Sequence, residues 1–416
     1  MKYRADLHIH SKYSMATSKS ADLINYCKWA KVKGINVLAT SDFTHPAWFT
    51  EISEKLIPAE PGFFRLRNEP DDNPFGQSVS PGFQIRFVIN GEISSIYKKN
   101  GKVRKIHNLV FVPDLVAAEK IRTKLDSIGN IHSDGRPILK LDSRNLVEIV
   151  KNASADAQVV PAHIWTPWFS LFGSRSGFDT LEECYGDMSD EIFALETGLS
   201  SDPAMNWRIS ALDKYTLISN SDAHSPAKLA REANVFNAEF DYPSMFQAVR
   251  TRKGFEGTLE FFPEEGKYHL DGHRKCSVCL KPEESVKLQG LCPECGKMLT
   301  LGVAHRVHEL ADRAEPKQPS DAPGYLSMVS LPQVLSQILS KGENTKTVQR
   351  EYSRIIEELG DEISILTKIA VSDIKTCAGD AVANAIARIR NKEVHASGGY
   401  DGEFGTIHVV PESEVS

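Results

Sequence analysis

The sequence predicts an α/β barrel over about residues 1–260, followed by a small four-cysteine module and a helical C-terminal region. Strand-length apolar runs alternate with helical patterns through the first part, and polar residues repeatedly end the apolar runs. Two Cys-x-x-Cys pairs come next. From about residue 325, apolar residues recur at helical spacing. The 416 residues are enough for two or three domains.

The first predicted strand, residues 3–10, carries two histidines on one face. With a period of two, Leu7 and Ile9 point to one side, and His8 and His10 to the other. Two imidazoles placed in this way can bind one metal ion. The alternative is an edge strand with two solvated histidines.

The following elements continue the alternation of strand and helix. A helix over about 19–33 ends at Gly34, and the mostly apolar run 35–42 ends in polar residues. A long surface loop is expected over 60–82, and a hairpin over 93–112 with its turn at Asn100-Gly101. Further helices are expected at 113–127 and 143–153, and further strands at 83–90, 157–163, 192–196 and 216–224. A doubly wound sheet would alternate in the same way, but no glycine-rich phosphate turn follows the first strand.

Candidate metal ligands stand near the ends of these apolar runs. They are His8, His10, Asp42, His45, Glu92, His107, His163, Asp222 and His224. Nitrogen and oxygen ligands without a thiolate suit Zn, Mn or Fe in a multinuclear hydrolytic site. Two or three ions about 3.5–4 Å apart activate water and stabilise both the phosphoryl and the leaving oxygens. Carboxylates such as Glu92 and Asp222 can bridge such ions, which single imidazoles cannot.

These residues resemble the ordered motifs of the polymerase-and-histidinol-phosphatase (PHP) metallophosphoesterase superfamily. The matching segments are His8-Ile9-His10, Asp42 with His45, Gly91-Glu92, His107, Ala162-His163 and Ser221-Asp222-Ala223-His224. The resemblance implies a distorted (β/α)7 barrel over 1–262 with a trinuclear site. It implies one metal bound by His8, His10, Glu92 and Asp222, a second by Glu92, His107 and His163, and a third by His45 and His224.

This sequence departs from the superfamily pattern in two places. The stretch Ser11-Lys12-Tyr13-Ser14-Met15 has no strong ligand after the first pair, and the usual Thr-Asp-His has become Ser41-Asp42-Phe43-Thr44-His45. Which of Asp42 and His45 binds a metal is left open at this point.

The four cysteines that follow the barrel predict a structural zinc site. They are Cys276, Cys279, Cys292 and Cys295, within an expected module over 263–304. Paired Cys-x-x-Cys knuckles at this spacing fit tetrahedral zinc, and four protein thiolates close the site to substrate. The expected helical domain, 305–416, ends in the glycine-rich stretch Gly398–Gly405, which lacks the Lys-Ser/Thr ending of a P-loop.

With this order of modules the whole chain resembles the endonuclease Q family of DNA repair nucleases. The resemblance implies a metal-dependent endonuclease that cuts on the 5′ side of uracil, hypoxanthine, xanthine or an abasic site. Asp222, Glu92 and His163 would be catalytic, with two or three divalent ions (Zn, Mn or Mg) in the barrel and one structural zinc. The partner would be double-stranded DNA with a damaged base, and DNA repair or replication clamp proteins are further candidates.

Two features predict contacts with nucleic acid, each with a structural alternative. Lys98, Lys99 and Lys102 lie near the hairpin turn and indicate either a solvated tip or a phosphate contact. Trp165 and Trp168 belong to an aromatic loop after His163 that follows neither helical nor strand periodicity. They form either core packing or a wall for a flipped-out base.

Composition limits the remaining possibilities. The net charge of -6 gives no overall positive field toward nucleic acid or membrane, so a polyanion site must be a local patch. No apolar run approaches 18 residues and no signal-peptide pattern begins the chain, so we expect a cytoplasmic prokaryotic protein with no membrane partner. The rival functions are a phosphatase of small phosphomonoesters and a non-catalytic DNA-binding scaffold.

Overall fold

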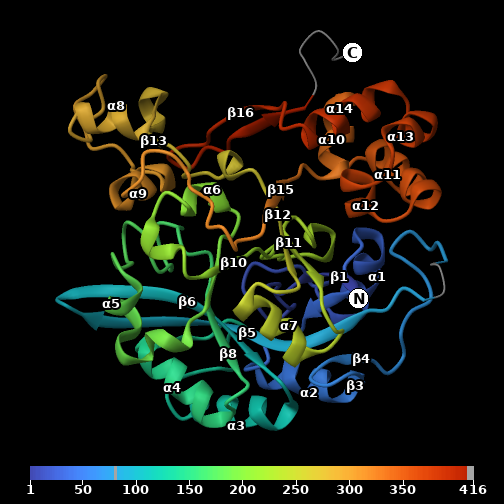
Figure 1. Ribbon diagram of the computed structural model, residues 1–416, viewed down its shortest axis with the longest axis horizontal. Helices are drawn as coiled ribbons and strands as arrows, with labels where there is room; N and C mark the ends of the chain where they lie inside the picture. The colour runs from blue at the N-terminus through green and yellow to red at the C-terminus, as the bar shows by residue number, and fades with distance from the viewer. Residues whose placement is uncertain (79–81, 410–416) are drawn as a thin grey trace.

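The computed structural model describes residues 1–78 and 82–409 (Figure 1). Part of the expected loop 60–82 and the last seven residues of the expected C-terminal domain therefore lie outside the described residues. No helix in the described ranges is long and apolar enough to cross a membrane.

A mixed sheet forms the centre of the N-terminal region. Strand β1 (Lys2–Asp6) pairs in parallel with β2 (Val37–Ala39), and β2 pairs in parallel with β5 (Arg86–Lys99). Strand β6 (Lys102–Val112) then runs antiparallel to β5, and β8 (Gln158–Pro161) antiparallel to β6. A separate parallel pair, β9 (Ala194–Glu196) and β10 (Thr216–Ile218), follows next to β8.

The segments that follow β1 and β10 are joined by a parallel bridge between Ile9 and Ala223. The carboxyl ends of these strands therefore surround one region of space. On the far side, β11 (Ala233–Asn237) pairs antiparallel with β1, and β12 (Phe255–Glu260) antiparallel with β11. The α/β class is confirmed, whereas the distorted (β/α)7 barrel stays a prediction, since several of these strand pairs are antiparallel. We refer to residues 1–262 as the barrel.

Helices surround the strands and begin at residues that the sequence marks. They are α1 (Leu23–Lys33), α2 (Pro46–Lys55), α3 (Leu115–Asp126), α4 (Ser143–Ala153), α5 (Leu181–Tyr185), α6 (Pro203–Asn206) and α7 (Tyr242–Thr251). Helix α1 starts later than expected because Asp22 caps it, accepting a hydrogen bond from the Asn25 amide. It ends at Gly34, which has a left-handed φ of 83°.

The long hairpin predicted from Asn100-Gly101 is present as β5 and β6. Both turn residues have positive φ, 52° for Asn100 and 73° for Gly101, as a tight two-residue turn requires. The shorter strands of this region are β3 (Leu56–Pro58), β4 (Phe64–Leu66) and β7 (Ile138–Leu139).

The cysteine-rich segment forms a small lobe at one end of the molecule, shown in orange in Figure 1. Its elements are β13 (Asp271–His273), β14 (Val278–Leu280), α8 (Pro282–Lys287) and α9 (Val303–Leu310). Arg306 of α9 fixes this lobe to the barrel, because its guanidinium donates to the carbonyl oxygens of Phe172 and Phe178.

The chain then returns to the central sheet before it forms the helical domain. Strand β15 (Tyr325–Ser327) pairs in parallel with β12. The C-terminal elements are α10 (Leu331–Ile338), α11 (Lys346–Leu359), α12 (Glu362–Thr367), α13 (Val371–Ala378), α14 (Asp380–Arg390), β16 (His395–Ser397) and β17 (Thr406–His408). Arg4 of β1 contacts Asp361 at 2.7 Å, and Lys33 of α1 contacts Glu362 at 2.5 Å, so the helical domain is tied to the barrel.

Candidate active site

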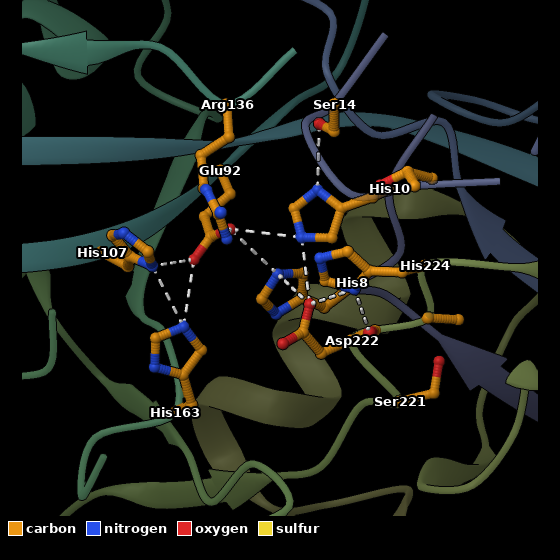
Figure 2. A network of polar contacts seen from close by, with 12 residues as sticks. His8, His10, Ser14, Glu92, His107, Arg136, His163, Ser221, Asp222 and His224 are labelled. Carbon is orange, nitrogen blue, oxygen red and sulfur yellow. Dashed lines mark hydrogen bonds and ion pairs between the residues drawn. The ribbon is translucent and has the colours of Figure 1, made fainter. Parts of the chain in front are cut away.

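Seven of the nine predicted ligands converge in one cluster (Figure 2). His8 and His10 follow β1, and Glu92 and His107 lie within β5 and β6. The remaining three follow β8 and β10 in the sequence; they are His163, Asp222 and His224. Side chains that are far apart in the sequence therefore share one site, as expected for the carboxyl ends of barrel strands.

Within the described residues the side chains form three overlapping groups whose ligand atoms lie within 4.8 Å of one another. The groups are His8, His10 and Glu92; Glu92, His107 and His163; and His10, Asp222 and His224. Glu92 and His10 each belong to two groups. The group of Glu92, His107 and His163 is the second set that the superfamily resemblance implied, whereas the group of His8, His10 and Glu92 lacks Asp222, the fourth member of the first implied set.

Glu92 is at the centre of this cluster. Its Oε1 lies 2.5 Å from His107 Nδ1 and 3.1 Å from His163 Nε2. Its Oε2 lies 3.5 Å from His8 Nε2 and 3.3 Å from His10 Nε2. A carboxylate whose two oxygens face different pairs of imidazoles has the arrangement of a bridging ligand.

Several buried atoms at this point have no hydrogen-bond partner in the described part of the chain. They are His8 Nε2, His10 Nε2 and Asp222 Oδ1. Asp222 Oδ1 lies 3.0 Å from His10 Nε2 and 3.6 Å from His8 Nε2. Buried polar atoms are costly when unpaired, and a divalent cation would satisfy all three at once. The donor set, imidazole and carboxylate only, fits Zn, Mn or Mg.

The backbone around the site is strained at three of its residues. Asp42, His163 and Asp222 have positive φ values of 45°, 29° and 48°, in a region that side chains other than glycine disfavour. Such strain is retained where the surrounding structure holds a functional geometry. Gly198 leaves room for His163, because a Cβ at Gly198 would lie 2.5 Å from the Cβ of His163.

The cluster shifts its pKa values in both directions: the pKa values of Glu92 and His107 are lowered, and the carboxylates around His8 and His10 raise the pKa values of those two rings. Burial alone would raise the pKa of Glu92, but the positive charges around it, Arg136 among them, outweigh burial and hold that pKa well below its usual range. Burial lowers the pKa of His107 to about 4. A carboxylate that stays ionised next to a neutral imidazole is the protonation state that metal binding requires.

Comparisons with known proteins show what this chain is similar to. Residues 330–393 match the family model described as the MJ0043 C-terminal domain. The uncharacterized protein MJ0043 of Methanocaldococcus jannaschii is 32% identical over 256 residues, which are 60% of this chain and 32% of that relative. The match therefore spans about a third of that relative's length.

Two solved structures match over nearly their whole length. The lesion-specific endonuclease PfuEndoQ from Pyrococcus furiosus has a TM-score of 0.86 and 31% identity, covering 100% of this chain and 97% of that chain. A complex of endonuclease Q with a 27-mer duplex that carries an abasic lesion at the active site has a TM-score of 0.85 and 31% identity, covering 100% and 98%. The chain belongs to the endonuclease Q family. It is a phosphoester-hydrolysing endodeoxyribonuclease, as the sequence predicted.

In this member of the endonuclease Q family, a set of buried side chains orients the ligands. Glu196 has no exposed surface; both its oxygens lie 3.1 Å from His8 Nδ1, and one accepts from the His163 amide at 2.8 Å. Carboxylate–histidine pairs of this kind fix the ring that faces a metal. The sequence predicts Glu196 only as the last residue of the strand 192–196, and this strand-end position is the signal that it offers.

Asp42 has the same supporting role, so its interpretation as a ligand is corrected. Its Oδ2 accepts from the amide and hydroxyl of Ser11 and from the Ser14 hydroxyl, while its Oδ1 faces His10 Nδ1 at 3.5 Å. Hydrogen bonds thus occupy Oδ2, and Oδ1 faces the ring nitrogen of His10 that points away from Glu92, so Asp42 belongs to none of the three groups in the described ranges. Gly135 permits this packing, since a Cβ there would lie 2.3 Å from Asp42 Oδ2.

His45 also differs from the expectation. In the described ranges it belongs to none of the three groups, and its Nε2 lies 3.0 Å from the carbonyl oxygen of His132. Its ring stacks on Tyr13. The implied pair of His45 and His224 is therefore not assembled, and His224 instead joins His10 and Asp222.

Arg136 is a residue of the site that the ligand analysis missed. It comes from the loop before β7, and its Nη1 lies 3.2 Å from Glu92 Oε2 (Figure 2). A planar guanidinium at a phosphoesterase site suits the oxygens of a phosphate. Only histidine and carboxylate side chains were candidate metal ligands, so this arginine was not among them.

A cavity of about 290 Å³ opens beside the cluster and shares His163 and Asp222 with it. Its other walls come from two further segments, Gly198–Ser200 and Gly266–His269, and from Thr166, Pro167, Pro263 and Val303. The cavity therefore joins the barrel to the start of the cysteine-rich lobe.

The two tryptophans of the aromatic loop after His163 differ in exposure. Trp165 is only 1% exposed and donates from Nε1 to Asn206 Oδ1, so its interpretation as a nucleic-acid contact is wrong. Trp168 is 42% exposed and its ring lies 5.8 Å from that of Tyr268, which lines the cavity. Trp168 stays a candidate for contact with DNA.

The hairpin lysines are similarly divided. Lys99 is held by the carbonyl oxygen of Cys184 at 3.0 Å and by Asp142 at 3.4 Å. Lys98 and Lys102 are exposed near the turn. The prediction of a phosphate contact remains for these two lysines.

The cysteine-rich lobe differs from the expected four-cysteine site at one position. Cys276, Cys292 and Cys295 group with His273, whereas the group does not include Cys279. In the β13–β14 pair His273 is opposite Val278, and Cys279 is opposite Gly272. Neighbouring residues of a strand point to opposite faces, so His273 and Cys279 lie on opposite faces of this pair. Cys279 instead lies 3.9 Å from the carbonyl oxygen of Gly398.

Proposed function

We propose that this protein nicks double-stranded DNA on the 5′ side of a deaminated base or an abasic site. The observation that carries the proposal is the cavity of about 290 Å³ that shares His163 and Asp222 with the ligand cluster. A nucleotide turned out of the duplex would place its base in this cavity while its 5′ phosphate lies against the cluster. The related endonuclease Q complex, which has a duplex with an abasic lesion at its active site, supports damaged duplex DNA as the substrate.

The polar atoms of the cavity suit the edge that deaminated bases have in common. Deamination replaces an exocyclic amine by a carbonyl next to a ring N–H, in uracil, hypoxanthine and xanthine alike. Ser200 Oγ and His269 Nδ1 are buried atoms of lining residues that have no partner in the described part of the chain. Burial lowers the pKa of His269 to about 4, so its ring is neutral at pH 7. A hydroxyl donor and a neutral imidazole acceptor would complement this carbonyl and N–H pair.

The site residues have separate tasks in the proposed hydrolysis. Divalent ions held by the cluster would supply Lewis acidity and an activated water. Asp222 would position the attacking water, Glu92 and His163 would hold the ligand geometry, and Arg136 would bind a non-bridging phosphate oxygen. The O3′ of the upstream nucleotide leaves, which yields a 3′-hydroxyl and a 5′-phosphate. The native ions, their number and the clamp-protein partners stay predictions.

A panel of end-labelled duplexes tests the proposal. The protein is incubated with Mg, Mn or Zn and with duplexes that contain uracil, hypoxanthine, an abasic site or no lesion. We expect a nick 5′ of each lesion and none in the undamaged duplex. Cleavage of free phosphomonoesters alone would instead support the phosphatase, and no cleavage at all the scaffold.

The variant Ser200→Ala separates recognition of the damaged base from hydrolysis of the phosphodiester bond. It should lower cleavage at uracil and hypoxanthine about tenfold, because one hydrogen bond to the base is lost. It should leave the abasic substrate unchanged, since that substrate has no base to contact. An equal loss on all substrates would contradict this assignment of the cavity.

A further inference from the structure

The glycine-rich stretch Gly398–Gly405 has no part in the function proposed so far. In the structure it lies on residues 264–272 and bonds to them through the backbone. The amides of Gly399, Gly402 and Gly405 donate to the carbonyl oxygens of Glu264, Lys267 and Glu265 at 2.8–3.2 Å. A Cβ at Gly399 would lie 2.4 Å from the Gly266 carbonyl oxygen, so only glycine allows this approach. We call Gly398–Gly405 the C-terminal strap.

The strap holds one large aromatic side chain out in solvent. Phe404 is 71% exposed, although its neighbours on the strap are fixed by backbone hydrogen bonds. The ammonium group of Lys267 lies 4.4 Å from the centre of the Phe404 ring. An exposed aromatic on a firmly held backbone, next to a cation, is typical of a binding surface rather than of a loose end.

Phe404 stands next to the cavity proposed for the damaged nucleotide. Lys267 and Tyr268 line that cavity, and Trp168 packs edge-on against Tyr268. Phe404 itself lines a second cavity, of about 470 Å³, between the barrel and the C-terminal helices. Both cavities are bordered by Leu199 and Gly266, so Phe404 and Lys267 lie where the two meet. Figure 1 shows the red strand β16, which leads into the strap, crossing from the C-terminal helices toward the cysteine-rich lobe.

We propose that Phe404 enters the base stack of the duplex when the damaged nucleotide is turned out into the neighbouring cavity. This inference rests on the proposed function. Turning a base out breaks its stacking on both sides and leaves a gap, and an apolar side chain placed in that gap offsets part of the cost. Phe404 has the exposure that insertion requires, whereas Tyr268 already lines the cavity and Trp165 is buried. Lys267 stands beside the ring with a charge suited to the adjacent phosphate.

A pair of substrates tests this role. Uracil is placed either in a fully paired duplex or in a short unpaired bubble of the same sequence, where it is already unstacked. Phe404→Ala should lower kcat/KM on the paired duplex ten- to hundredfold, the range that loss of one aromatic stacking contact produces. Cleavage within the bubble should fall by no more than about threefold, and Phe404→Trp should restore most of the duplex activity.

Two controls make the outcome decisive. Met298→Ala removes another exposed apolar side chain, 67% exposed on the cysteine-rich lobe, and should behave as the wild type on both substrates. Equal losses of Phe404→Ala on duplex and bubble, or no loss on either, overturn the inference while the proposed function stands. A wild-type protein that does not cut at uracil overturns the proposed function and this inference with it.

Discussion

The two groups of metal-binding side chains in this protein differ in how they are held. In the barrel, the ligands His8 and Asp222 are more than 200 residues apart in the chain. The ligands that surround Glu92, which are His8, His10, His107 and His163, are all buried. In the cysteine-rich lobe all four ligands lie between His273 and Cys295, and only Cys292 is buried. The barrel cluster is positioned by a large apolar core, whereas the lobe has two short strands and little core of its own.

This contrast indicates what the metal does in each place. A domain with an extensive core folds without its ions, so the barrel can use its ligands for chemistry. A small lobe gains folding free energy from a structural ion, and its ligands serve stability. Loss of a ligand should therefore cost activity in the barrel and stability in the lobe.

The largest expected effect is that of Asp222→Asn. It removes the charge of an unpaired oxygen that faces two imidazoles and should lower cleavage at least about a thousandfold. The melting temperature should change by no more than a few degrees, because the residue does not belong to the apolar core. Asp71→Asn, an exposed carboxylate, serves as the control. Substantial residual turnover in Asp222→Asn would break the comparison on the barrel side.

His273→Ala tests the lobe and should lower its zinc affinity at least about a hundredfold, since a direct ligand is lost. Metal analysis and limited proteolysis of the full chain would detect the loss of zinc and the local loosening. Cys279→Ser is the matched control and should keep its zinc, because Cys279 faces Gly398. The reverse result, with zinc lost from Cys279→Ser alone, would restore the four-cysteine site that the sequence predicted.

Glu196→Gln addresses a side chain that supports the cluster without belonging to it. It should weaken metal affinity and activity by about 10- to 100-fold, the range for residues that orient a metal-binding histidine. A metal titration measured by calorimetry separates the loss of metal affinity from unfolding of the protein. Unchanged affinity would mean that the barrel core alone fixes the orientation of His8.

The smallest expected effect is that of Glu260→Gln on the melting temperature. It depends on pH and concerns a buried carboxyl group of the barrel outside the metal cluster. Burial raises the pKa of Glu260 to about 8, so the folded protein favours the neutral acid. A raised carboxyl pKa destabilises the fold as pH rises from about 5 to above 8. The variant should match the wild type at pH 5 and melt a few degrees higher at pH 8.5. A wild-type melting temperature that rises over this interval and equals that of the variant would refute it.

Local pattern was sufficient for part of the site. The alternation of Leu7, His8, Ile9 and His10 places both imidazoles on one face, whatever the rest of the fold. The Asn100-Gly101 turn sets the hairpin register in which Ser94 is opposite His107, which brings Glu92 within reach of that ring. These relations depend on neighbouring residues and on a two-residue turn, so the sequence alone determines them.

Other assignments were decided only by the tertiary structure. Trp165 and Trp168 are three residues apart, yet Trp165 is buried against Asn206 and Trp168 is exposed. The difference arises because a distant chain segment covers only Trp165. Asp42 supports the neighbouring ligands and is not itself a ligand, because Ser11 and Ser14 donate hydrogen bonds to its Oδ2. The pairing of β13 with β14 turns His273 toward the three cysteines and Cys279 away from them. The sequence by itself determined which residue types can bind metal and near which strand ends they lie. The long-range packing decided which atoms meet, because that depends on what lies behind each side chain.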